Sequence, residues 1–315
     1  MGPIFDIVLP IFVIILTGYI AGRCGLLNES GSEALNRFVY YVALPIMLFS
    51  TMAVVDPQTI FNWPFLAAYL GGGLITFLIS IVASRLIFRN PRTETSLFGL
   101  SGIFGNTGYM GIPLVYVAFG ENGQTLAVIA TVSQGVFMIP IILIMLESGR
   151  NNKTRSRSIR FGVIARVVAF NPLILAPVLG ILWSVTGMAL PPPIKTFCSI
   201  LGPAAGPCAL FALGLFMVGK PVSEGMAEVS IMVVLKLIIY PVSVGVMAYG
   251  YLDLPPLTAA VAVLLAALPT GANCFVLAQN YRVFVHRASS VILVSTAVAV
   301  LTVSLLFASP YFQIR

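Results

Sequence analysis

Two short polar stretches interrupt apolar segments and contain residue types suited to binding a small molecule. They are GNTGYMGIP from Gly105 to Pro113 and LPTGAN from Leu268 to Asn273. Amide and hydroxyl side chains hydrogen-bond to anions, and prolines interrupt a helix and free its backbone groups. The candidate binding residues are Asn106, Thr107, Pro113, Pro269, Thr270, Asn273 and Gln134.

The sequence lacks the motifs of common enzymes and metal sites. It has no HExxH, no G-x-S-x-G and no Walker loop. Its four cysteines include no close pair, and its single histidine, His286, matches no zinc-ligand spacing with them. We therefore expect no enzymatic activity, no metal ion and no cofactor.

The composition indicates that lipid surrounds most of the chain. Of 315 residues, 59% are apolar and only 9% are charged, whereas soluble domains contain about 25% charged residues. So little polar surface cannot cover a soluble particle of this size. The composition excludes an ordinary soluble enzyme, a disordered chain and a disulfide scaffold, and it predicts an integral membrane protein.

Ten apolar segments have about the length that a helix needs to cross a bilayer. The first has no basic start and no cleavage site, so it is not a signal peptide. The segments are 3–22, 33–53, 62–84, 95–119, 124–146, 168–188, 195–219, 229–250, 257–280 and 287–308.

Positive charges alternate between the connections. The connections after segments 1, 3, 5, 7 and 9 contain nearly all of the bases, whereas the intervening ones contain only Lys195. Because basic loops stay in the cytoplasm, both termini are expected outside, in the bacterial inner (plasma) membrane. The net charge of +7 then reflects topology, and the expected partner is the lipid bilayer rather than nucleic acid.

The basic linker 148–166 divides the chain into 1–147 and 167–315, each with five segments. An odd number of spans turns the second half upside down, which predicts an inverted repeat. Three matches at nearly constant spacing support this repeat weakly. The matched pairs are Pro45 with Pro207, Pro10 with Pro177, and Asn106 with Asn273.

Segments 4 and 9 are expected to be broken helices. Repeated glycines, Asn106 and Pro113 predict unwinding near 105–113, and Pro269 and Thr270 lie in the middle of segment 9. For the glycines alone, close helix packing is the alternative explanation. Backbone groups freed by a break must be buried or line a wet cavity. Half-helix N-termini there favour an anion.

Two charged residues inside segments are candidates for proton or sodium coupling. Lys236 lies within segment 8, and a lysine that snorkels to the interface is the alternative. Asp6 lies near the outer end of segment 1 and is either interfacial or a proton site. No acidic pair lies in mid-membrane, which disfavours a carboxylate-based antiporter. Uniport and ion coupling both remain open.

Three stretches resemble the auxin efflux carrier family, including its bacterial malonate and malate permease-like members. They are FVYYVALPIMLFSTMA, GNTGYMGIPLVYVAFG and LPTGANCFVLAQNY. The resemblance implies ten helices in two inverted five-helix repeats, similar to bile-acid and sodium/proton carriers. It also implies scaffold and transport subdomains, each drawn from both repeats. Helices 4 and 9 would cross beside the substrate, with Asn106, Pro113, Pro269 and Asn273 at the crossover.

The same resemblance implies an elevator-like movement and homodimers. The plant members have a long central cytoplasmic loop, which is short and basic here, so regulation by loop phosphorylation is not carried over. We expect an all-α secondary transporter of a small organic anion, such as malonate, malate or an auxin-like acid. The alternative is a membrane receptor or sensor without transport, although no loop is long enough for a signalling module.

Overall fold

The computed structural model describes residues 4–55, 62–149, 170–220, 225–309 and 312, and these residues are helical with no strand longer than one bridge pair. Most of the linker predicted at 148–166 lies outside them. Seven helical segments are long and apolar enough to cross a membrane, which confirms an α-helical membrane protein. They are Asp6–Arg23, Ser30–Ala53, Trp63–Leu86, Thr107–Gly149, Pro192–Phe216, Met226–Tyr251 and Val285–Ala308.

The predicted segments 4, 5, 6 and 9 do not each correspond to a separate full-length span. Thr107–Gly149 is one helical run, but Gly120 within it has φ 68° and ψ −157°, which a glycine adopts without steric strain. Segments 4 and 5 therefore meet at this kink. Two further apolar helices, Pro172–Val185 and Pro256–Ala266, are shorter than a full span. The count of ten spans stays a prediction.

The chain divides into two compact units, and each contains residues from both halves of the sequence. Unit 1 comprises residues 1–62, 107–132 and 170–220. Unit 2 comprises residues 63–106, 133–169 and 221–315.

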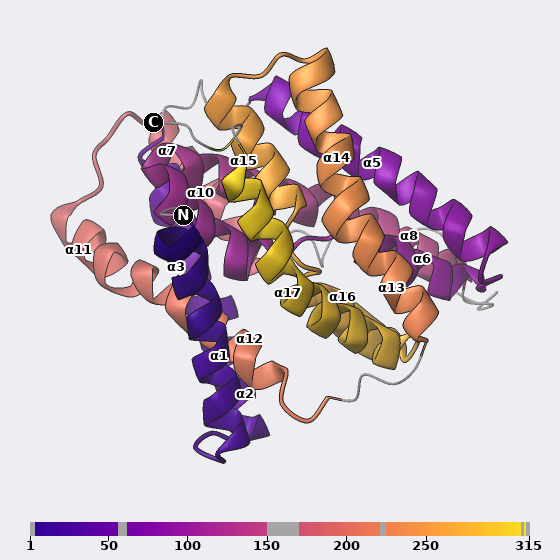
Figure 1. Ribbon diagram of the computed structural model, residues 1–315. Helices are drawn as coiled ribbons and strands as arrows, with labels where there is room; N and C mark the ends of the chain where they lie inside the picture. Colours follow the sequence, from indigo (N-terminus) through magenta and orange to yellow (C-terminus); the bar gives the residue numbers. More distant parts are fainter. Residues whose placement is uncertain (1–3, 56–61, 150–169, 221–224, 310–311, 313–315) are drawn as a thin grey trace. The chain divides into compact units, whose positions relative to one another are not determined.

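Unit 1 is built from pairs of helices whose backbones meet at glycines. A β-carbon on Gly18 would collide with the backbone of Phe211, and one on Gly214 would collide with Ile15, so α1 and α12 touch closely (Figure 1). Such close approach at small residues is how membrane helices associate. The helices are η1 (Ile4–Val8), α1 (Leu9–Arg23), α2 (Glu29–Phe38), η2 (Val39–Ala43), α3 (Leu44–Ala53), η3 (Thr107–Gly111), α7 (Ile112–Ser133), α10 (Pro172–Val185), α11 (Pro192–Leu201), η5 (Gly202–Ala204) and α12 (Ala205–Phe216).

Unit 2 contains the remaining helices. They are α5 (Trp63–Leu86), α6 (Arg92–Ile103), η4 (Gln134–Met138), α8 (Ile139–Gly149), α13 (Met226–Val234), η6 (Leu235–Ile239), α14 (Tyr240–Gly245), η7 (Val246–Tyr251), α15 (Pro256–Ala266), α16 (Asn273–Tyr281) and α17 (Val285–Ala308). In Figure 1, α5 and α14 run side by side. A β-carbon on Gly72 would lie 2.7 Å from the backbone nitrogen of Val244, so only glycine permits this contact.

The glycines of segment 4 serve two purposes. A β-carbon on Gly99 would lie 2.6 Å from the Phe77 ring, and one on Gly102 would lie 2.7 Å from the Ser80 hydroxyl. Both glycines are inside α6, so they let this helix pack on α5. The chain leaves the helix only at Phe104, beside Gly105. Close packing thus accounts for the first two glycines, and the break begins at the third.

Prolines mark the starts of helices rather than their interiors in several places. Pro172, Pro192 and Pro256 are the first residues of α10, α11 and α15. The first helical position needs no donor, and the fixed φ of proline suits a helix start. Pro113 differs from these, because η3 (Thr107–Gly111) continues directly into α7 and Pro113 lies inside the helical run that begins at Thr107. The irregular stretch is therefore residues 104–106, shorter than the predicted 105–113.

Candidate functional site

The two helix breaks of unit 2 pair with each other. Helix α6 ends at Ile103 and α15 ends at Ala266, and Gly105 and Thr270 form an antiparallel bridge between the chain segments that follow. The N–H of Asn106 donates to the carbonyl oxygen of Pro269 at 2.8 Å, and the N–H of Gly271 donates to that of Phe104 at 2.9 Å. The backbone N–H and carbonyl groups that lose their helical partners at one break therefore form hydrogen bonds with those of the other break. Buried backbone groups need such partners because no water reaches them.

Gln134 supports the first break from the adjacent helix. Its Oε1 accepts the N–H of Gly105 at 3.0 Å, and its Nε2 donates to the Tyr69 hydroxyl at 2.7 Å. The Gln134 side chain is fully buried. Gln134 therefore contacts the paired breaks, and its amide holds the backbone of Gly105 and the hydroxyl of Tyr69.

The second break has an equivalent support. The N–H of Thr270 donates to the Ser295 hydroxyl on α17 at 3.0 Å. The Thr270 hydroxyl itself donates to the carbonyl oxygen of Ser101 at 2.9 Å, in the last turn of α6. Helix C-termini leave carbonyls without intrahelical partners. The buried Thr270 side chain therefore caps α6.

Asn106 differs from these neighbours because its side chain has unused hydrogen-bonding capacity. The residue is 5% exposed, and its Nδ2 has no hydrogen-bond partner among the described residues. Leaving a buried donor unpaired costs about 1–3 kcal/mol. Its backbone is meanwhile held by Pro269. A rigid backbone thus presents an amide donor that an anionic oxygen can satisfy.

Asn273 lies at the other side of the paired breaks. It is the first residue of α16, is half-buried, and follows Ala272, which provides no side-chain cap for the helix. The first turn of a helix has a partial positive charge. The Asn273 amide and this helix start are therefore polar groups of the kind that bind a carboxylate.

Lys236 enters the same region from η6. Its side chain is fully buried, and its Nζ donates to the carbonyl oxygen of Ala266 at 2.5 Å, at the end of α15. The ammonium also lies 4.8 Å from the centre of the Tyr240 ring. Lys236 therefore turns into unit 2 and does not snorkel.

The remaining predicted residues belong to unit 1. Thr107 is 3% exposed and begins η3, directly after Asn106 in the chain. A β-carbon on Gly206 of α12 would lie 3.1 Å from the Pro113 side chain, so Pro113 packs within this unit. Asp6 is exposed in η1. The paired breaks thus bring together Asn106, Pro269, Thr270, Gln134 and Lys236, all in unit 2.

Tyr69, Ser101 and Ser295 were not predicted, although the sequence repeat contains a signal for one of them. Tyr69 and Lys236 are separated by the same spacing as Asn106 and Asn273. Thr76 and Ser243, again at this spacing, form a 3.4 Å hydrogen bond between α5 and α14. Extending the repeat through segments 3 and 8 would therefore have selected Tyr69. Ser101 acts through its backbone, which no side-chain pattern reveals.

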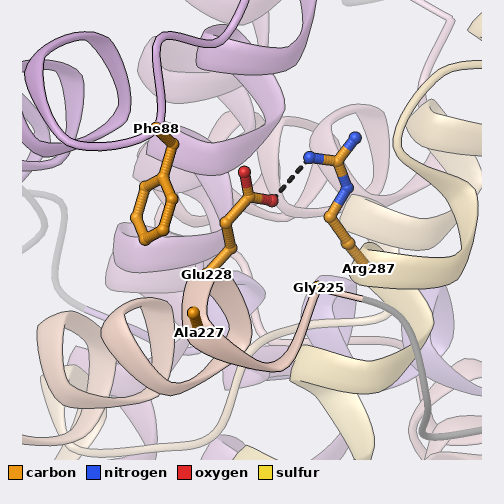
Figure 2. Close-up of a pocket in the computed structure, with 5 residues that line it drawn as sticks. All are labelled: Phe88, Gly225, Ala227, Glu228 and Arg287. Carbon is orange, nitrogen blue, oxygen red and sulfur yellow. Dashed lines mark hydrogen bonds and ion pairs between the residues drawn. The ribbon is translucent and has the colours of Figure 1, made fainter.

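A separate cavity of about 430 Å³ lies at the start of α13 and α17, lined by Phe88, Gly225, Ala227, Glu228 and Arg287 (Figure 2). Arg287 bonds to Glu228 at 2.5 Å and to Glu94 at 2.7 Å, and its guanidinium lies 4.2 Å from the Phe284 ring centre. The charged groups of this cavity therefore satisfy one another. They connect the first turns of α6, α13 and α17.

Comparison with known proteins identifies the family. Residues 3–307 match the family model described as "Membrane transport protein". The "Putative malonate transporter" of Rhizobium meliloti is 31% identical over 96% of this chain and 95% of its own length. "Auxin efflux carrier component 5" of Arabidopsis thaliana is 23% identical over 92% of both chains.

A third relative is the "Lysosomal cholesterol signaling protein" of Mus musculus, which is 30% identical over 69% of this chain but only 26% of its own length. The match to the family model extends over nearly the whole sequence and agrees with the resemblance of the three motifs. Seven apolar helices fit the same assignment. The chain therefore belongs to the membrane transport protein family that includes the auxin efflux carriers, and it is an integral membrane protein.

Proposed function

We propose that this protein is a secondary transporter of small organic anions, with its binding site at the paired breaks of unit 2. The observation that carries the proposal is the buried Asn106 amide, whose Nδ2 has no partner among the described residues. In a membrane transport family, such a donor beside two broken helices is suited to a transported ligand. Amide donors and helix N-termini recognise carboxylates without requiring a full charge at each contact.

Malonate, a small dicarboxylate, is the substrate that we propose first. The supporting comparison is the relative from Rhizobium meliloti, whose name refers to malonate and which aligns over nearly the whole chain. Malate is a close chemical analogue of malonate. An auxin-like aromatic acid is the more distant alternative, supported by a plant relative of lower identity.

We propose that unit 2 moves as the transport subdomain of an elevator and that unit 1 is the scaffold. The backbone of the paired breaks lies wholly within unit 2, so one body would contain the bound anion throughout the movement. Each unit contains residues from both halves of the chain, as two inverted repeats require. The antiparallel bridge between Gly105 and Thr270 joins one break from each half of the chain, as the crossing of helices 4 and 9 in a ten-helix arrangement would require.

The proposed location is the bacterial inner membrane, with both termini outside. The alternation of basic connections along the sequence supports this orientation. The test replaces the four native cysteines, introduces one cysteine at either end, and labels it with a membrane-impermeant reagent in intact and in permeabilised cells. Labelling of either terminus only after permeabilisation would contradict the orientation.

The test of the site is uptake of radiolabelled malonate into proteoliposomes by Asn106→Ala and Asn273→Ala. We expect each variant to lose at least about tenfold in uptake, corresponding to about 1.4 kcal/mol of binding free energy, while remaining folded in detergent. Asn280→Ala is the matched control, because Asn280 is exposed near the end of α16. Unchanged uptake by both site variants would reject the site.

We propose uniport, driven by the membrane potential and the substrate gradient. The polar contacts described at the paired breaks involve neutral groups apart from Lys236, which bonds to a backbone carbonyl. Uptake should then respond to an imposed potential but not to a pH or sodium gradient at constant potential. Accumulation driven by either ion gradient alone would establish coupling instead.

One comparison favours a second function, that of a membrane sensor. The mouse signalling relative contains a stretch similar to this chain within a much longer protein. A sensor would bind malonate in detergent without moving it. Binding to the purified protein combined with no flux in proteoliposomes would therefore support the sensor and reject transport.

A further inference from the structure

Lys236 is the feature of unit 2 that the proposed site leaves unexplained. Its side chain is fully buried in η6, within the candidate span Met226–Tyr251. Its Nζ contacts the carbonyl oxygen of Ala266 and the ring of Tyr240, which are both neutral, and it interacts electrostatically with the buried free thiol of Cys274. Among the described residues, the ion pairs involve other side chains. An ammonium buried in a membrane without a counter-ion is strongly unfavourable.

The need of the Ala266 carbonyl for a hydrogen-bond donor does not by itself explain why a charged residue, Lys236, lies at the end of α15. The end of α6 occupies the equivalent place at the first break, and there the neutral Thr270 hydroxyl binds the carbonyl oxygen of Ser101. The end of α15 has a cation instead, Lys236 on Ala266. A helix C-terminus attracts positive charge, but the attraction is modest.

The ammonium lies next to the backbone that presents Asn106. A β-carbon on Gly105 would be 3.5 Å from Lys236 Nζ, and Gly105 immediately precedes Asn106. Lys236 therefore lies against the backbone of the first break, and it belongs to the same unit as the unpartnered Asn106 donor. In a medium of low dielectric constant, a positive charge acts strongly on an anion bound at this break.

We infer that Lys236 is a built-in positive charge that the bound carboxylate balances, and that it makes the site select carboxylates over neutral analogues. The inference rests on the proposed function and deepens it. In this role Lys236 stays in the protein as a fixed charge, and no proton or sodium ion needs to accompany the substrate. Lys236 also binds the Ala266 carbonyl, so its charge and its hydrogen bond must be tested separately.

Lys236→Gln separates the two roles, because a glutamine amide retains a donor for Ala266 but has no charge. The measurement is isothermal titration of purified protein with malonate and with malonamide, its uncharged diamide. We expect Lys236→Gln to weaken malonate binding at least tenfold without weakening malonamide binding, and Lys236→Arg to retain the preference for malonate. Lys195→Gln is the matched control, because it removes one exposed positive charge from α11.

The results distinguish the inference from the function on which it rests. Wild-type protein that binds no carboxylate would overturn the proposed function. Wild-type binding of malonate that is unchanged in Lys236→Gln would overturn only the inference. Loss of malonate binding in Lys236→Met but not in Lys236→Gln would show that Lys236 merely caps α15, which also overturns it.

A measurement on the unmodified protein decides the matter if Lys236→Gln does not fold. Proteoliposomes are preloaded with monomethyl malonate, a monoanion, and its exchange with external monomethyl malonate is measured. The membrane potential is set with potassium and valinomycin. If Lys236 and the anion move together, the loaded unit has no net charge, and the exchange rate should not change with potential. A rate that changes several-fold over 100 mV would contradict the inference.

Discussion

The backbone N–H of Asn106 donates to the carbonyl oxygen of Pro269 at 2.8 Å, joining the break after α6 to the break after α15. A proline cannot donate from its own nitrogen, but its carbonyl accepts normally. The bond fixes the backbone of Asn106 while leaving its Nδ2 unpartnered among the described residues. A binding group held by a rigid backbone loses little entropy when a ligand arrives.

Gln134→Leu should strongly destabilise unit 2. The substitution removes the acceptor of the Gly105 N–H and the donor to the Tyr69 hydroxyl, both buried. We expect a loss of about 2–4 kcal/mol in unfolding free energy, because two buried groups lose a partner. Unfolding in detergent, followed by circular dichroism, measures it. Gln279→Leu, at an exposed position of α16, is the control and should change stability little.

Thr270→Val should leave the carbonyl oxygen of Ser101 without its hydroxyl donor while preserving the volume of the side chain. The expected loss is about 1–2 kcal/mol of unfolding free energy, whereas Thr270→Ser should stay close to wild type. The two melting temperatures in the same detergent provide the comparison. Equal melting temperatures for the valine and serine variants would refute the capping role.

Gly72→Ala should disrupt the contact between α5 and α14, because its β-carbon would lie 2.7 Å from the backbone nitrogen of Val244. Overpacking against a backbone atom costs about 1–3 kcal/mol. Gly71→Ala is the adjacent control, since its β-carbon would meet only the flexible end of Met247, at 3.2 Å. Melting temperature should fall clearly for Gly72→Ala alone, and a similar fall in both variants would argue against a specific close contact.

Arg287→Gln should loosen the connection between the first turns of α6, α13 and α17. Glu94 and Glu228 would each lose a charged partner, and the three side chains are 11–25% exposed. Because solvent screens such groups in part, we expect a loss of about 1–2 kcal/mol. The loss should shrink at high salt. Arg282→Gln, an exposed arginine, is the control, and a salt-independent loss would exclude an electrostatic cause.

The sequence predicted the helix breaks of the candidate site, but not the contacts that its side chains make. The glycine and proline pattern predicted breaks in segments 4 and 9, and the structure has irregular backbone at 104–106 and 267–272. Thr270 and Gln134 were predicted as binding groups, yet their described contacts support backbone. A threonine or glutamine in an apolar segment looks the same in the sequence whether its side chain binds a ligand or supports the backbone. Only the position of its partner distinguishes the two roles.

The sequence by itself determined the membrane environment, the helical class, the family and the places where the helices break. These properties depend on local composition and on backbone chemistry at glycine and proline, which act over a few residues. The tertiary structure decided which polar groups are satisfied. Lys236 reaches the end of α15, and the backbone N–H of Asn106 donates to Pro269 while its Nδ2 has no partner among the described residues. Those pairings join residues far apart in the chain, so only the packing of unit 2 could specify them.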